Sequence, residues 1–124
     1  MNINTTIQNI RSKWATIFPL LPLSFQLAPG NAKPPYAVLR LSTITPNEPT
    51  TTYRDWQMTG TFYLFDVSDS TIIANTQTLV DAFDRGAITG IDSSLVQSAE
   101  IDVNYTDQSA LWSSSVPVEF RWTT

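Results

Sequence analysis

The chain of 124 residues contains no histidine and no cysteine. Their absence removes the side chains that proteins use most often for proton transfer near neutral pH, for metal ligation and for disulfide bonds. A serine nucleophile would need a neighbouring base, and the only side-chain amines are Lys13 and Lys33, neither of which has an apolar sequence context. We therefore expect a protein that is not an enzyme and that uses no cofactor and no metal.

Charge and long hydrophobic runs are also scarce. Charged residues make up 15% of the chain and hydrophobic residues 42%, a balance typical of a folded domain with one core. The net charge of −4 disfavours a surface that binds DNA by neutralising its phosphates. No segment approaches the ~20 apolar residues of a membrane span, and the first residues do not resemble a secretory signal. We expect one globular domain with no membrane partner.

What the chain does have is a regular succession of helix and strand patterns. Apolar residues at helical spacing predict helices over Thr5–Phe18, capped by Asn4 or Thr5, and over about Ser70–Phe83. Period-two alternation predicts the strands Leu23–Leu27, Tyr36–Thr45, Thr51–Phe65, Ala99–Thr106 and Val116–Thr123. Short connections favour antiparallel hairpins. The expected fold class is α+β, a largely antiparallel β-sheet with two helices packed on one face in a single domain.

The pattern also predicts details within these elements. The strand that begins at Tyr36 should turn its more apolar set, Ala37, Leu39, Leu41 and Thr43, toward the core. The long strand Thr51–Phe65 should bend near Gly60, and the preceding hairpin tip carries Asn47, Glu48 and Pro49. The segment Asp107–Ser115, which includes three consecutive serines, is interpreted as a flexible polar loop.

Two tryptophans are candidates for a subunit interface. Trp56, beside Arg54 and Asp55, and Trp112 lie in or next to predicted loops rather than within clear apolar stripes. Packing in the core is the default interpretation of a tryptophan. The alternative is contact with another subunit, because large aromatic side chains dominate interface hot spots.

Three carboxylates form a second candidate group. Glu100 and Asp102 are two residues apart on one strand face, and Glu119 could lie across from one of them. A hard cation needs six or more oxygen ligands, and no Asp-x-Asp-x-Asp-Gly loop supplies them. A solvated, acidic strand face is the favoured interpretation.

The order of elements resembles a known family. The helix at the start, the strand segments 35–41 and 56–66 and the helix Ile72–Phe83 follow one another as in the tail-terminator, or tail-completion, proteins of long-tailed bacteriophages. The resemblance covers nearly the whole chain and lies in element order and length.

The resemblance implies a virion structural protein of the tail or neck, assembled in the host cytoplasm. Such a subunit forms a homo-oligomeric ring, expected to be a hexamer, that caps the tail tube protein and joins the head connector or neck protein, with DNA only as passing cargo. Arg54, Asp55, Trp56 and Trp112 would then serve the subunit interface. Glu100, Asp102 and Glu119 would line the lumen, where carboxylates repel DNA phosphates.

Two alternatives remain open from the sequence. The first is another neck, tube or baseplate structural subunit. The second is a small-ligand-binding module in which aromatic side chains line a pocket between sheet and helices.

Overall fold

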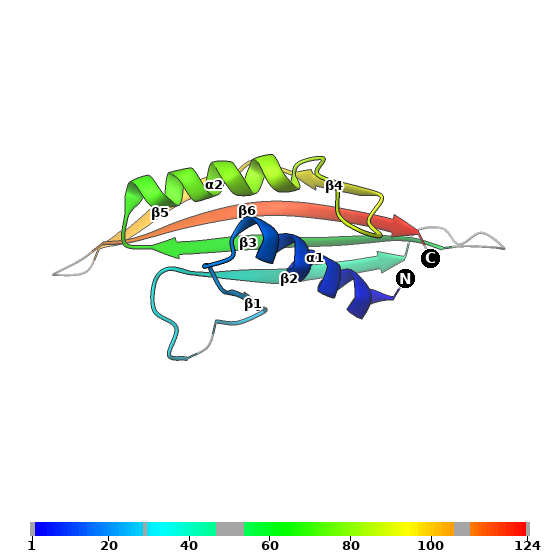
Figure 1. Ribbon diagram of the computed structural model, residues 1–124, viewed down its shortest axis with the longest axis horizontal. Coiled ribbons are helices and arrows are strands. Elements are labelled where there is room, and N and C mark those ends of the chain that lie inside the picture. Colours follow the sequence, from blue (N-terminus) through cyan, green and yellow to red (C-terminus); the bar gives the residue numbers. More distant parts are fainter. Residues whose placement is uncertain (1, 29, 47–53, 106–109, 124) are drawn as a thin grey trace.

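The computed structural model describes residues 2–28, 30–46, 54–105 and 110–123, which form one sheet and two helices (Figure 1). The helices are α1 (Ile3–Ile17) and α2 (Asp69–Phe83). The strands are β1 (Leu23–Phe25), β2 (Tyr36–Pro46), β3 (Asp55–Asp66), β4 (Ser93–Val96), β5 (Glu100–Tyr105) and β6 (Ala110–Thr123). The hairpin tip at 47–49 lies outside the described residues.

The strand order in the sheet is β1-β2-β3-β6-β4, and β5 also pairs with β6, beyond the region where β4 pairs. Only the pairing of β1 with β2 is parallel among the strands described, and the other pairings are antiparallel. The predicted α+β fold with a largely antiparallel sheet is confirmed. The three long strands β2, β3 and β6 give the molecule its elongated shape (Figure 1).

Side chains close the first turn of both helices. The Asn2 side chain accepts a hydrogen bond from the Thr5 backbone N–H at 2.8 Å, so α1 begins at Ile3, and the prediction of Asn4 or Thr5 as the cap is wrong. The Ser68 hydroxyl accepts from the Thr71 backbone N–H at 3.3 Å and starts α2. A short side chain with an acceptor oxygen at this position satisfies an otherwise unpaired N–H of the first turn.

Both helices cover the same face of the sheet, as the apolar stripes predicted (Figure 1). The Phe62 ring of β3 connects them, with its centroid 5.3 Å from the Trp14 ring of α1 and 4.9 Å from the Phe83 ring of α2. The core is completed by alternate residues of β6, namely Val116, Val118, Phe120 and Trp122. These aromatic rings pack on one another, in the layer where the ligand-binding alternative would place a pocket.

A β-bulge at Ser42 reverses which side chains at the end of β2 point toward the helices. Leu41 pairs with Gly60, but the next paired residue is Thr43, opposite Thr59. The extra residue turns Thr43 away from the helices and brings Ile44 to their side, so the expectation that Thr43 faces the core is wrong. Gly60 lies directly beside the bulge, where a Cβ would come within 2.8 Å of the Arg40 carbonyl oxygen.

The expectation that Asp107–Ser115 forms a polar loop is wrong for residues 110–115, which are the described part of that segment. Strand β6 already begins at Ala110, and its residues up to Ser115 pair with β5. Ser114 is buried, and its hydroxyl lies 2.7 Å from the Thr76 hydroxyl of α2. A hydrogen-bonded serine thus occupies a core position that apolar periodicity could not reveal.

Candidate assembly surfaces

The face of the sheet opposite the helices carries aromatic and hydroxyl side chains. The Tyr36 and Phe65 rings stack across β2 and β3 with their centroids 4.7 Å apart. A shallow groove of about 610 Å³ lies next to them, lined by Tyr63, Phe65, Glu100, Ile101, Asp102, Ser113 and Ser115. We call this side of the sheet the open face.

Two of the three candidate carboxylates meet on the open face. Glu100 pairs with Ser115 and Asp102 with Ser113, so both side chains project from edge strand β5 beside the groove, and both residues are exposed. Exposed carboxylates on an edge strand keep their hydration and give the groove a negative rim.

Glu119 is separate from that pair. It lies on the open face of β6, opposite Thr59 and Leu95, so the expectation that it lies across from Glu100 or Asp102 is wrong. Its Oε1 accepts a hydrogen bond from Arg121 Nε at 2.6 Å, which forms an ion pair on the same strand. Glu119 is therefore partly neutralised by its own strand.

The residues Arg54, Asp55 and Trp56 lie together at one end of the sheet. The Trp56 ring stacks on Trp122 with a centroid distance of 6.2 Å, and the Arg54 guanidinium lies 5.8 Å from the Trp56 ring centre. Asp55 accepts a hydrogen bond from the Thr123 hydroxyl at 3.0 Å. Trp56 is half-buried against the core and lies in β3, so it has one packed face and one face near solvent.

Trp112 lies far from that group. It pairs with Asp66 at the other end of β6, on the helix-covered side, and is half-buried against the core. The two candidate tryptophans therefore sit at opposite ends of the sheet, in strands and not in loops. They do not form one surface patch.

Sequence reasoning missed the way charge is divided along the chain. Residues 1–46 contain four of the seven basic residues and none of the eleven acidic residues. Residues 69–105 contain six acidic residues and one basic residue, Arg85. Total net charge hides this segregation, but a count by segment reveals it.

No group of three or more acidic side chains is placed to hold a metal ion in residues 2–28, 30–46, 54–105 and 110–123. Neither α1 nor α2 is long and apolar enough to cross a membrane.

Comparison with models of known protein families finds no match to this sequence, and comparison with curated proteins finds none either. Among solved structures, the chain is similar to one from a structure described as the virion of a native gene transfer agent (GTA) particle. The TM-score is 0.61 at 12% identity, over 95% of this chain and 91% of that chain. The match shows that the two chains share a fold along nearly their whole lengths.

Proposed function

We propose that the protein is a structural subunit of a phage-like virion, and specifically the tail terminator. The observation that carries the proposal is the fold shared with a chain of a gene transfer agent virion over 95% of this protein. The order of helices and strands that resembles tail terminators supports the same role.

In this proposal the protein works by assembly and not by chemistry. Copies form a ring, expected to contain six subunits, on the last ring of the tail tube, and the far side of the ring receives the head connector or neck protein. The strands β2, β3 and β6 run the length of the molecule, so their two ends are suited to contacts above and below the ring (Figure 1). One of these ends carries Arg54, Asp55 and Trp56, and the other carries Trp112.

The open face is proposed to line the lumen through which DNA passes. Its carboxylates include Glu100 and Asp102 on β5 and Glu119 further along β6, and they outnumber the two arginines of that face, Arg40 and Arg121. Carboxylates repel phosphate and let DNA slide without sticking. The helices α1 and α2 would then lie on the outside of the ring.

Deletion of the gene from a producing phage or particle tests the position in the virion. A terminator stops growth of the tube, so its loss is expected to give tails of variable and excessive length in negative-stain micrographs. Loss of a neck subunit would instead give tails of normal length without heads, and loss of a baseplate subunit would give few tubes. Either of these latter results would contradict tail termination while keeping a virion role.

Light scattering of the purified protein tests ring formation directly. A mass of about six subunits, with rings visible by microscopy, is expected. If the protein stays monomeric even when mixed with purified tail tubes, and adds no terminal density to them, ring capping is wrong.

A further inference from the structure

The two lateral margins of the sheet carry opposite charge. The elements α1, β1 and β2, with the loop between the two strands, form one margin, which we call the basic margin (Figure 1). The elements α2, β4 and β5 lie at the other margin, which we call the acidic margin (Figure 1). The exposed charged residues of the basic margin are Arg11 and Lys33, while Arg40 of β2 projects onto the open face. Those of the acidic margin are Asp69, Asp81, Asp84 and Asp92, with Arg85, while Glu100 and Asp102 of β5 project onto the open face.

Each margin also exposes large apolar side chains. On the basic margin, Leu20 is 93% exposed and Leu27 is 81% exposed. On the acidic margin, Ile73 of α2 is 54% exposed and Tyr105 of β5 is 72% exposed. Apolar residues surrounded by charge are the usual composition of a protein–protein contact.

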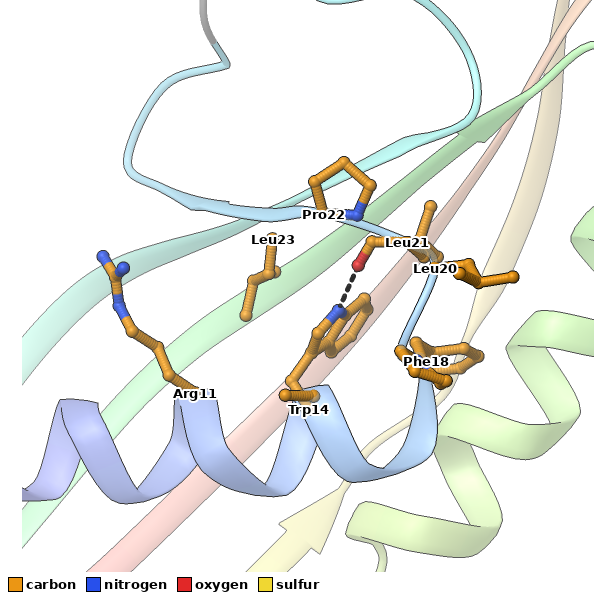
Figure 2. Close-up of a pocket in the computed structure, with 9 residues that line it drawn as sticks. Arg11, Trp14, Phe18, Leu20, Leu21, Pro22 and Leu23 are labelled. Atoms are coloured by element: carbon orange, nitrogen blue, oxygen red, sulfur yellow. Dashed lines mark hydrogen bonds between the residues drawn. The ribbon is translucent and has the colours of Figure 1, made fainter.

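The basic margin is hollowed where α1 meets β1. A groove of about 520 Å³ lies there, with Trp14, Phe18 and Leu20 among its lining residues and Arg11 on one side (Figure 2). The Trp14 indole N–H donates a hydrogen bond to the Leu21 carbonyl oxygen at 2.9 Å, which fixes the wall of the groove (Figure 2). The groove is therefore built into the fold and ready to accept an apolar side chain.

We infer that the basic margin of one copy binds the acidic margin of the next copy, with Ile73 of α2 directed toward the groove beside Leu20. This inference rests on the proposed ring. The partner is expected to be a second copy of this chain, because the charge of each margin is opposite to that of the other margin. Two-fold pairing of a margin with itself would oppose like charges. A contact between two different surfaces repeats head to tail and closes into a ring when the rotation permits.

Crosslinking of single-cysteine variants tests the contact, since the natural chain has no cysteine. Leu20→Cys and Ile73→Cys proteins, mixed and treated with a flexible bis-maleimide, are expected to give a covalent dimer that neither variant gives alone. The control pair is Leu20→Cys with Gln57→Cys, because Gln57 lies on the open face of the central strand β3, between β2 and β6. Equal crosslinking of Leu20→Cys with itself, or a mixed yield no higher than that of the control pair, would overturn the inference.

Charge reversal in the same crosslinking assay tests the electrostatic basis. The basic margin is reversed by Arg11→Glu with Lys33→Glu in the Leu20→Cys protein. The acidic margin is reversed by Asp69→Lys, Thr78→Lys and Asp81→Lys in the Ile73→Cys protein, at three exposed positions of α2. Either reversal alone should lower the crosslinked yield about tenfold, and mixing the two reversed proteins should restore it, because the charges are again opposite.

The matched control for reversal is Lys13→Glu. Lys13 is two residues from Arg11 on α1 but lies beside Ala87, Ile88 and Thr89, away from β1. It should leave the yield unchanged. The margins do not recognise each other by charge if Lys13→Glu lowers the crosslinked yield as much as the reversals do. The same conclusion follows if mixing the two reversed proteins does not restore the yield. Normal rings and terminated tails without the Leu20–Ile73 crosslink would overturn this contact and leave the proposed function standing.

Discussion

The two faces of the same three strands differ in what their side chains do. On the helix-covered face, Leu39, Phe62 and Phe120 are completely buried. On the open face, their neighbours Arg40, Tyr63 and Glu119 retain contact with solvent. Because successive residues of a strand point to opposite faces, each strand builds the core and presents a surface at once. The comparison teaches that the open face can acquire binding functions at little cost to folding, whereas the covered face cannot.

The strongest test of this comparison is a pair of truncations at adjacent positions. Phe62→Ala removes the ring that packs between Trp14 and Phe83, and it should lower the free energy of unfolding by about 3–5 kcal/mol. Tyr63→Ala, on the open face one residue away, is the matched control and should cost about 1 kcal/mol. Urea unfolding followed by tryptophan fluorescence measures both. Equal losses would show that the open face also supports the fold.

The close approach at the bulge predicts the next largest effect. In Gly60→Ala the new methyl group would meet the Arg40 carbonyl at 2.8 Å and the Leu41 side chain at 3.3 Å, so strands β2 and β3 must shift. We expect a loss of about 1–3 kcal/mol, as for other overpacked sites. Gly30→Ala is the control, because no atom lies within 4 Å of its added Cβ, and its effect should stay within about 0.5 kcal/mol. Thermal unfolding of both variants separates steric crowding from a general effect of replacing glycine.

Most of the covered face could be predicted from the sequence, because burial imposes periodicity. Helices α1 and α2 and the central parts of β2, β3 and β6 follow directly from apolar spacing. The bend expected at Gly60 stays a prediction: β3 runs unbroken from Asp55 to Asp66, and the irregularity beside Gly60 is the bulge at Ser42 of β2. Alternation predicts β1 within Leu23–Leu27 but not its parallel pairing with β2. The strand β4 has only four residues, too few to produce a period.

The candidate surfaces were less predictable because exposed residues obey no such constraint. Ser114 looked like part of a loop, although its partner Thr76 is 38 positions away in the sequence and only the fold brings the two hydroxyls together. Charge alone predicts that Glu119 lies across from Glu100 or Asp102, but the strand that pairs with β6 at Glu119 is β4. The charge division between the margins could have been read from the sequence, but its meaning depends on strand order.

Trp56 has features of both faces, because its side chain contacts the core and is also partly exposed to solvent. Its ring stacks on the buried Trp122 while remaining half-exposed at the end of the sheet. Trp56→Ala should therefore cost about 1–2 kcal/mol of stability, from one aromatic pair and the buried part of the ring, and leave the monomer folded. If this end of the sheet contacts another subunit, assembly should weaken much more than stability, as measured by light scattering.

Trp122→Ala provides the contrasting variant for Trp56. Its side chain is 1% exposed, so its loss should reduce stability by about 3–5 kcal/mol. Comparable unfolding by both variants would place Trp56 in the core and remove it from the candidate interface.

The smallest effect on stability, and the most direct test of the open face, is expected from neutralising its acidic pair. Glu100→Gln with Asp102→Asn changes two exposed residues of an edge strand, so stability should change by less than about 0.5 kcal/mol. If these residues line a lumen, loss of their charge lets DNA phosphates approach the wall, and the ejection of DNA from assembled particles should slow. Glu100→Asp with Asp102→Glu is the matched control, because it changes the same two exposed side chains and keeps both charges. Ejection that is unchanged in the neutralised variant, or slowed equally by the charge-retaining variant, would mean that the charges of Glu100 and Asp102 do not act on passing DNA.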